Sequence, residues 1–339
     1  MKKLVLTIVA LIACVVLKAA DNITVTVAYN GATATVYIPE GAEQYVTCSS
    51  GTSSHVVLVQ SELVGENTSG EIFYTLSGTS EDGGFYLDGK YKATIELNNL
   101  TLTNPSGPAI NIQDGKRIKI EVKKGTTNTL ADGKDKNYNG CIHCEGHLEL
   151  KKTGTLNVTG NYKHAIYSKE YLQIAKPTVN ILGAKKDGIH CKQYFWMEDD
   201  CKVNISGVGD DGIQVEVDDR TAYTGALSNH EGVDDNGEEI DENSGYFYQD
   251  AGTLTINECG GKAIKADGDV VFNGGKATVD ANAIEKNIYT SISTLRNDDV
   301  KTEGEVIYDL TGRQMLKDLR KGQIVIIRKD NEVRKVIVK

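Results

Sequence analysis

Short runs of alternating apolar and polar residues recur between Gly107 and Ala281, at a period near two dozen residues. In each repeat an isoleucine follows a small residue, and a small or apolar residue stands two positions later. This period of two is typical of a strand with one buried face. The anchoring isoleucines are Ile110, Ile142, Ile166, Ile189, Ile213 and Ile264.

Two further short strands follow each anchoring isoleucine, and both alternate in the same way. The second strand has the expected inward pairs Leu148 and Leu150, Leu172 and Ile174, Phe195 and Met197, Val270 and Phe272. The third has Leu156 and Val158, Val179 and Ile181, Val203 and Ile205, Leu254 and Ile256. Such strands bury their apolar faces only when coils stack. The pattern therefore predicts an all-β chain, a right-handed parallel β-helix of about 24 residues per coil. A β-sandwich is the alternative, but its strands do not repeat their side chains in register.

The first twenty residues resemble an export signal. Lys2 and Lys3 precede an apolar run that is shorter than the roughly 20 residues of a membrane-spanning helix. Cleavage near Ala20 leaves a secreted protein, whereas Cys14 ends a lipobox-like sequence and offers a lipid anchor at the cell surface instead. No other stretch is apolar enough to cross a membrane, so we expect no transmembrane span.

The repeat also sets the expected domain boundaries. Residues 21–285 form the β-helix, with 22–104 as the N-terminal cap and first coil. The spacing of 51 residues between Ile213 and Ile264 is one coil plus an insertion at 218–245. Residues 286–303 are the expected linker, and residues 304–339 a small separate β segment.

The formal net charge of −10 is unevenly distributed. Residues 115–202 carry 16 basic and 10 acidic side chains, whereas residues 216–258 carry 12 acidic side chains and one arginine. The basic part suits an anionic polymer and the acidic part suits cations, although both are also compatible with solvated faces. An exported, acidic chain makes nucleic acid a poor candidate partner. Only one CxxC pair, Cys141 and Cys144, is present, so a cysteine-bound zinc ion is not favoured.

Carboxylates recur just before the anchoring isoleucines, and they are candidate metal ligands. Asp187 and Asp211 should lie on adjacent rungs about 5 Å apart. Two carboxylates this close repel each other unless a cation or a proton lies between them. Calcium takes about six to eight oxygen ligands, so the expected calcium site contains Asp187, Asp210 and Asp211, completed by Asp218 and Asp219. The alternative is a set of solvated turn aspartates.

Two ladders of outward positions are candidate ligand-binding surfaces. Tyr171 and Tyr194 occupy equivalent positions on the second strand, and Trp196 lies two residues further on. Exposed aromatic rings offer flat apolar faces that suit sugar rings. His143, Tyr167 and His190 form the other ladder, on the first strand, and could hydrogen-bond sugar hydroxyls or carboxylates. The alternative for the first ladder is packing beneath the inserted loop.

Several sequence segments resemble those of a secreted bacterial carbohydrate-binding β-helix family known from cellulolytic clostridia. They are residues 74–84, 91–104, 155–166 and 209–214, and the similarity covers about residues 60–285. The resemblance implies a fold like that of pectate lyases and binding of plant polysaccharide, including cellulose and polygalacturonate, with calcium. The acidic insertion after Val217 departs from the family pattern, which puts cation sites in that segment in doubt.

The C-terminal segment resembles the sorting tail of exported Bacteroidetes proteins. Residues 306–313, followed by residues 321–328, carry this likeness, although the segment is short and lacks a tyrosine often found there. The resemblance implies export machinery as a partner. A terminal β-ribbon beside the helix is the alternative.

Together these features favour non-catalytic, calcium-assisted binding of a plant-type or uronate-containing polysaccharide. The first alternative is a calcium-dependent lyase, in which Lys186 or Lys262 removes the proton beside a uronate carboxyl group. The second alternative is a surface adhesin or structural protein. The fold accommodates all three roles.

Overall fold

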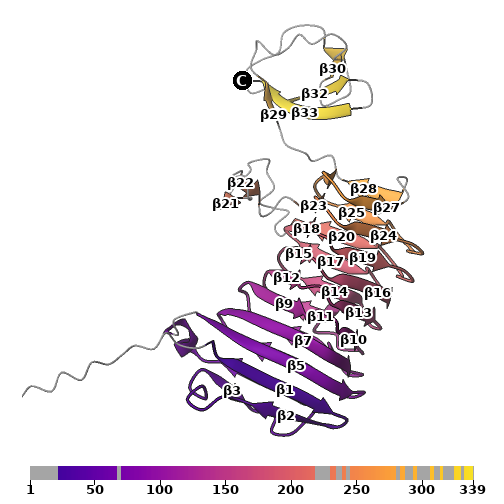
Figure 1. The fold of residues 1–339 in the computed structure, drawn as a ribbon. Helices are drawn as coiled ribbons and strands as arrows, with labels where there is room; N and C mark the ends of the chain where they lie inside the picture. The colour runs from indigo at the N-terminus through magenta and orange to yellow at the C-terminus, as the bar shows by residue number, and fades with distance from the viewer. Residues whose placement is uncertain are drawn as a thin grey trace, which may run out of the picture.

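Among the residues that it describes, the computed structural model consists of strands with a short 3₁₀ helix, η1 (Glu62–Glu66). The residues it describes are 22–66, 70–217, 230–233, 239–241, 245–279, 283–286, 293–295, 306–308, 314–315, 324–329 and 332–338. Parallel strands stack coil upon coil into a parallel β-helix, as the repeat predicts (Figure 1).

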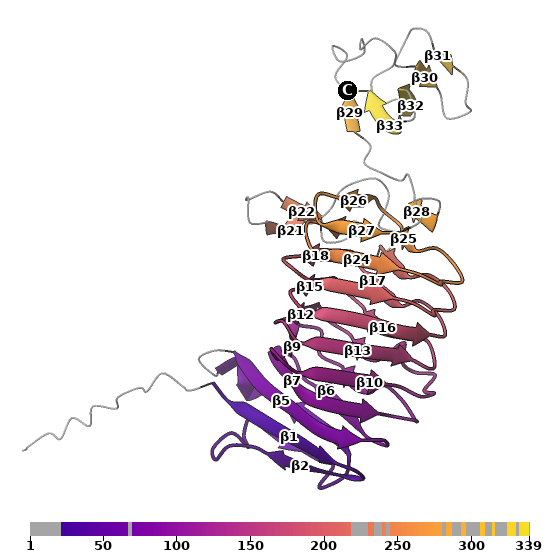
Figure 2. The ribbon, with the colours of Figure 1, turned by 45° about the vertical axis from the view of Figure 1, so that its right-hand side comes forward.

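Three columns of strands run through the stack (Figure 2). The first column is β4 (His55–Gln60), β6 (Gly84–Asp88), β8 (Ile110–Ile112), β11 (Gly140–Cys144), β14 (His164–Ser168), β17 (Ile189–Lys192), β20 (Ile213–Glu216), β25 (Ile264–Ala266) and β28 (Ile284–Lys286). The second is β9 (Ile118–Val122), β12 (Leu148–Lys151), β15 (Leu172–Ala175), β18 (Tyr194–Glu198), β23 (Tyr246–Gln249) and β26 (Val270–Phe272). The third is β10 (Thr127–Ala131), β13 (Thr155–Gly160), β16 (Thr178–Ala184), β19 (Lys202–Ile205), β24 (Thr253–Ile256) and β27 (Lys276–Thr278).

The second and third columns are joined in the N-terminal coils. There the long strands β5 (Glu71–Ser80) and β7 (Lys92–Thr103) run through both columns, and β7 pairs with β9 along its first half and with β10 along its second. The cap consists of β1 (Thr24–Asn30), which pairs in parallel with β5, its antiparallel partner β2 (Thr33–Tyr37), and β3 (Val46–Cys48), antiparallel to β4. The antiparallel pairs end the stack with a different strand direction and thereby cover its first edge.

The predicted register is confirmed. The anchoring isoleucines pair in order from Ile110 to Ile264 and are fully buried. Cys144, Ser168 and Cys191 point into the core on consecutive rungs, and none of the described cysteines forms a disulfide. On the outer face of the third column, Asn180 donates to Asn157 and Asn204 donates to Asn180, each at 2.9 Å. This asparagine ladder stabilises neighbouring coils through side-chain hydrogen bonds, as expected.

The last complete coil departs from the expected pattern. Phe272 was expected to point inward, but its side chain is 43% exposed, and Val270 is only half-buried. The rung that follows Phe195 and Met197 in the second column is Phe247 and Gln249, which the sequence pattern missed. Val270 and Phe272 stand one rung further, at the end of the stack, where little packs on them.

The insertion and the C-terminal segment contain separate small sheets. β21 (His230–Val233) and β22 (Glu239–Asp241) form an antiparallel hairpin within 218–245. A five-stranded sheet consists of β29 (Ser293–Leu295), β30 (Val306–Tyr308), β31 (Gln314–Met315), β32 (Ile324–Lys329) and β33 (Glu332–Val338). Four of these strands lie in the expected segment 304–339, whereas β29 lies in the expected linker 286–303 and pairs with β33. The expected leader at 1–20, with Cys14, lies outside the described residues, and within the described part no helix is long and apolar enough to cross a membrane.

Candidate functional site

Four side chains of the first column form what we call the imidazole–carboxylate cluster: His164, Asp187, His190 and Glu216. Asp187 lies at its centre and is almost fully buried. Its Oδ2 atom is 3.2 Å from Nδ1 of His164 and 2.9 Å from Nδ1 of His190. Nε2 of His190 in turn lies 3.6 Å from Oε2 of Glu216. The parallel register brings these groups together, because β14, β17 and β20 lie on consecutive rungs.

Burial and hydrogen bonding perturb the ionisation of this cluster in opposite directions. Burial alone would raise the pKa of Asp187, but the two histidine contacts outweigh it and hold that pKa well below its usual range. Burial lowers the pKa of His164. Burial alone would also lower the pKa of His190, but its hydrogen bonds with Asp187 and Glu216 outweigh burial and raise that pKa. The cluster is therefore a buried carboxylate between two unlike imidazoles.

The carboxylates predicted to bind calcium come together next to this cluster. Carboxylate oxygens of Asp187, Asp210 and Asp211 lie within 4.8 Å of one another. Asp211 accepts a 2.6 Å hydrogen bond from the backbone N–H of Lys262 at Oδ1 and donates its own N–H to Asp187 Oδ1 at 3.1 Å. Its Oδ2 is buried, accepts no hydrogen bond and lies 3.4 Å from Nζ of Lys265. Asp218 and Asp219 lie outside the described residues.

The first-column ladder of His143, Tyr167 and His190 has the predicted register but not the predicted accessibility. His143 and Tyr167 are stacked at 5.1 Å between ring centroids, and Tyr167 and His190 at 5.5 Å. The Tyr138 ring packs edge-on against His143. Because each ring lies against its neighbours along the stack, all three side chains are buried. The expectation that they form an open sugar-binding surface was wrong for this reason.

A second ladder, which we call the corner ladder, consists of His147, Tyr171, Tyr194 and Trp196, where the first column turns into the second. The first three rings are nearly parallel, with centroids 4.2 and 4.8 Å apart. The rings therefore stack on one another, and Tyr194 is only 7% exposed, which corrects the expectation of freely exposed faces. Trp196 is half-buried, and its indole N–H donates to Asp250 at 2.7 Å. Nε2 of His147 lies 2.9 Å from Glu170, and the Tyr171 hydroxyl donates to Glu149 at 3.2 Å. The indole of Trp196 keeps part of its surface accessible.

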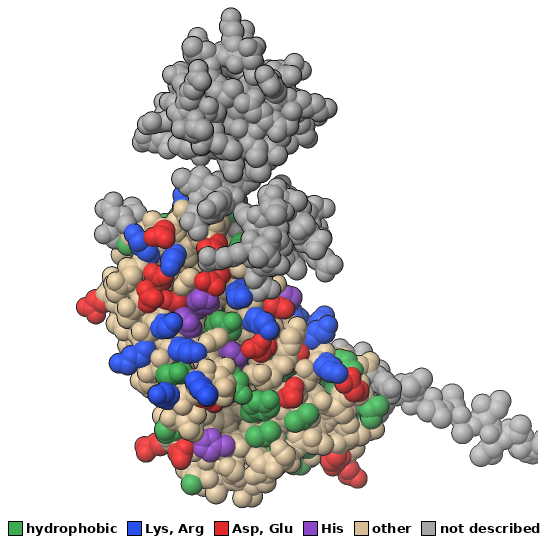
Figure 3. Space-filling model, turned by 180° about the vertical axis from the view of Figure 1, so that it is seen from behind, with side chains coloured by type: hydrophobic (Ala, Val, Ile, Leu, Met, Phe, Trp, Pro, Cys, Tyr) green, Lys and Arg blue, Asp and Glu red, His purple; other side chains and the backbone are tan. Residues whose placement is uncertain are grey.

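Many of the lysines expected to attract an anionic polymer have carboxylate partners. Lys169 lies 2.8 Å from Glu145, and Lys151 lies 3.0 Å from Glu198. Seen from behind, the molecule shows histidines among mixed basic and acidic side chains rather than one continuous basic patch (Figure 3). Lys186 is exposed.

The two lysines of the lyase hypothesis are not equivalent. Lys186 precedes Asp187 on an exposed turn. Nζ of Lys262 lies 3.8 Å from Glu285, so its charge already has a partner. A free amine close to the carboxylates is what proton abstraction requires, and Lys186 fits that requirement better than Lys262.

The sequence interpretation missed several residues of these sites. His164 and Glu216 complete the imidazole–carboxylate cluster, and Tyr248 continues the outer side of the corner ladder above Trp196. Asp250 accepts the indole hydrogen bond. The residues 246–249 repeat the alternation of 194–197, so a search for that pattern beyond the insertion would have found Tyr248.

A family model described as "Carbohydrate-binding domain-containing protein" matches residues 62–313 of the chain. The chain belongs to this family. Among similar proteins, a carbohydrate-binding domain-containing protein of Acetivibrio thermocellus is 30% identical over 118 residues, which are 32% of this chain and 41% of that protein. The match thus spans about two fifths of the relative's length.

A solved structure also resembles the chain. It is described as the polysaccharide lyase-like protein from C. thermocellum, as a gadolinium derivative. The TM-score is 0.52 at 20% sequence identity, over 78% of this chain and all of the other. At this level of identity the likeness shows the fold.

Proposed function

We propose that the protein binds a plant-type or uronate-containing polysaccharide without cleaving it, with calcium assisting. The observation that carries the proposal is the corner ladder, in a chain of a carbohydrate-binding family. Aromatic rings stand at equivalent positions on the consecutive rungs of His147, Tyr171 and Tyr194, so a polymer lying along this part of the stack meets a ring at each rung. Polar ring edges hydrogen-bond sugar hydroxyls, and the Trp196 indole supplies the apolar surface on which a sugar ring packs.

We place calcium at Asp210 and Asp211, bordered by Asp187. The support is Asp211 Oδ2, a buried oxygen that accepts no hydrogen bond and has the Lys265 ammonium at 3.4 Å, next to two further carboxylates. Calcium requires oxygen ligands of this kind. A bound ion adds positive charge close to an otherwise acidic surface, and it would attract a uronate carboxylate.

The test compares binding of polygalacturonate and cellulose by wild type, Trp196→Ala and Tyr37→Ala, with calcium and with chelator. Tyr37 is the matched control, because it is an exposed aromatic residue on the cap, far from the corner ladder. We expect Trp196→Ala to weaken binding by about 2 kcal/mol, roughly thirtyfold, and Tyr37→Ala to bind as wild type. Chelator should weaken uronate binding, and Asp211→Asn should remove most of the calcium effect.

Product formation separates the binder from a lyase in the same experiment. A lyase releases unsaturated, ultraviolet-absorbing product from polygalacturonate, and Lys186→Ala should abolish it. Product from wild type that is lost in Lys186→Ala would overturn the proposal. Equal binding by wild type and Trp196→Ala would exclude the corner ladder. Glycan-independent binding to a protein surface would instead favour the adhesin role.

We also propose that the chain is exported, to the medium or to the cell surface, with the C-terminal segment engaging the export machinery. The support is the leader-like sequence at 1–20 and the tail-like sequence at 304–339. Mass spectrometry of the protein recovered from its host should find a mature chain starting near Asp21. A lipid on Cys14 would indicate a surface lipoprotein, and an intact Met1 would contradict export.

A further inference from the structure

The two contacts between His164 and Asp187 require opposite protonation states at Nδ1 of His164. Nδ1 of His164 lies 3.3 Å from the backbone nitrogen of Asp187, which donates to it, and 3.2 Å from Oδ2 of the same residue. As an acceptor, Nδ1 carries a lone pair, which then opposes the lone pairs of the carboxylate. As a donor to the carboxylate, Nδ1 carries a proton, which then opposes the amide hydrogen. One neutral imidazole tautomer therefore cannot satisfy both contacts.

The atoms around Oδ2 are arranged as metal ligands are. Ligand atoms bonded to one ion at about 2.0–2.2 Å, with tetrahedral or octahedral angles, lie about 2.8–3.6 Å apart. Oδ2 of Asp187 lies 3.2 Å from Nδ1 of His164 and 2.9 Å from Nδ1 of His190. One ligand atom from each of the three side chains falls within 4.8 Å of the others. A cation between Nδ1 of His164 and Oδ2 removes the opposition of their lone pairs, and in binding it Nδ1 gives up its 3.3 Å hydrogen bond from the Asp187 N–H.

We propose that His164, Asp187 and His190 bind a divalent transition-metal ion of the zinc type. Two imidazoles and one carboxylate favour such an ion over calcium, which takes oxygen ligands. The calcium proposed at Asp210 and Asp211 faces Oδ1 of Asp187, whereas this ion faces Oδ2.

The neighbours of the three ligands support this assignment. Glu216 lies against the other ring nitrogen of His190, where a carboxylate commonly orients a metal-bound imidazole. Glu216 itself is only half-buried, so this side of the cluster lies next to the solvent. The site is independent of the proposed glycan binding.

The test uses the full chain, stripped with chelator and titrated with Zn²⁺ and Co²⁺ by calorimetry. We expect one equivalent to bind and to raise the melting temperature, because a ligand of the native state adds stability. An excess of Ca²⁺ should not displace the ion. The Co²⁺ form should show the visible spectrum of nitrogen and oxygen ligands, without a thiolate charge-transfer band.

The matched variants are His164→Gln, His190→Gln and His143→Gln. His143 is an equally buried imidazole on the same ladder, and its Nε2 pairs with Glu145 at 2.9 Å. Loss of either proposed ligand should weaken binding by more than about tenfold, and His143→Gln should bind as wild type. If a ligand variant does not fold, X-ray absorption of the zinc-loaded wild type decides, because it must show two imidazoles and no sulfur. Absence of binding, full displacement by Ca²⁺, sulfur ligation, or unchanged binding in both ligand variants would overturn the proposal.

Discussion

Asp114 is a carboxylate with no exposed surface, in the turn before β9. It accepts hydrogen bonds from the backbone N–H groups of Tyr91 at 3.1 Å and of Lys116 at 2.8 Å. Burial outweighs these bonds and raises the pKa of Asp114 to about 6. A carboxyl group held in this way fixes the turn but prefers its proton in the folded state.

The raised pKa of Asp114 predicts a definite pH dependence of stability. The folded state binds the proton more tightly than the unfolded chain, whose Asp pKa is about 3.9. This contribution to the free energy of unfolding is therefore present below about pH 4 and is lost as pH rises to about 6. Asp114→Asn does not titrate. The melting temperature of wild type minus that of the variant should accordingly fall between pH 4 and pH 7, and a difference that is constant or rises over that interval would contradict this account.

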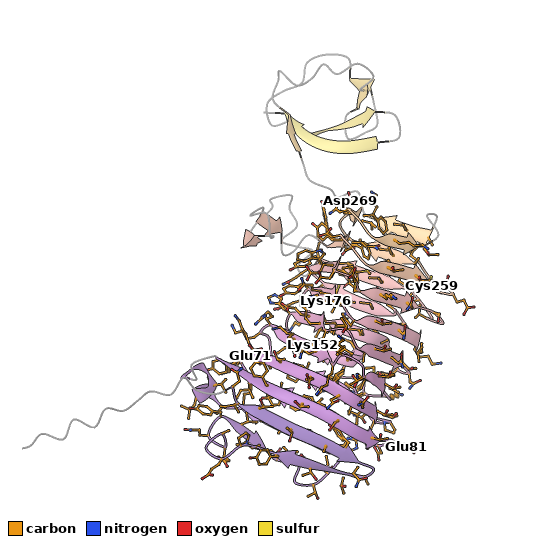
Figure 4. The ribbon with its side chains drawn as sticks, in the orientation of Figure 1. Glu71, Glu81, Lys152, Lys176, Cys259 and Asp269 are labelled. Carbon is orange, nitrogen blue, oxygen red and sulfur yellow. The ribbon has the colours of Figure 1, made fainter. Side chains whose placement is uncertain are left out.

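At the scale of elements, one left-handed residue turns each coil from the second column into the third. The left-handed residue stands one to three positions before the third-column strand, and it is Gly125, Gly252 or Gly275 but also Lys152, Lys176 or Asp199. Lys152 and Lys176 are labelled in Figure 4 and lie along the stack of coils. A side chain at positive φ is strained relative to glycine. The corner therefore depends on the backbone geometry of the stack rather than on the preference of each residue.

Lys176→Gly tests this interpretation of the corner. Its φ of 79° suits glycine, and its ammonium group has only a 3.7 Å exposed contact with Asp199. We expect the variant to be more stable by up to about 1 kcal/mol, measured by denaturant unfolding. The matched control is Lys185→Gly, an exposed lysine that is not at positive φ, which should lower stability by about 0.5–1 kcal/mol. Destabilisation by both changes would show that the corner is not strained.

At the scale of the whole molecule, the protection of backbone amides against hydrogen exchange should vary along the stack. Central strands such as β13 and β14 pair on both sides and enclose fully buried residues. β27 and β28 each pair with only one neighbour among the described strands, and all three side chains of β27 are exposed. Amide exchange followed by mass spectrometry should therefore be slowest in β13 and β14 and fastest in β27 and β28. Equal protection at both places would mean that the last coil is covered more completely than its exposed residues indicate.

The sequence by itself determined the fold and the order of the ladders. A repeat of Ile142, Ile166, Ile189 and Ile213 at a nearly constant spacing allows one stacking register, and a shift by one residue would turn every isoleucine out of the core. The same register placed Asp187 beside Asp211 and Tyr171 beside Tyr194. These neighbours follow from counting residues, because a parallel stack makes equivalent positions adjacent.

Only the tertiary structure decided what each ladder is able to contact. Counting residues gives the direction of a side chain, but not whether the rings above and below it occupy its faces, as they do for Tyr167 and Tyr194. Counting places His164 on the rung next to Asp187, and Glu216 on the rung after His190. It left both out of the sites, because whether these side chains meet depends on their conformation. The burial of these groups arises from the packing of several coils at once, and it sets the pKa of Asp187 and leaves Oδ2 of Asp211 without a hydrogen bond. No single segment of the sequence contains that information.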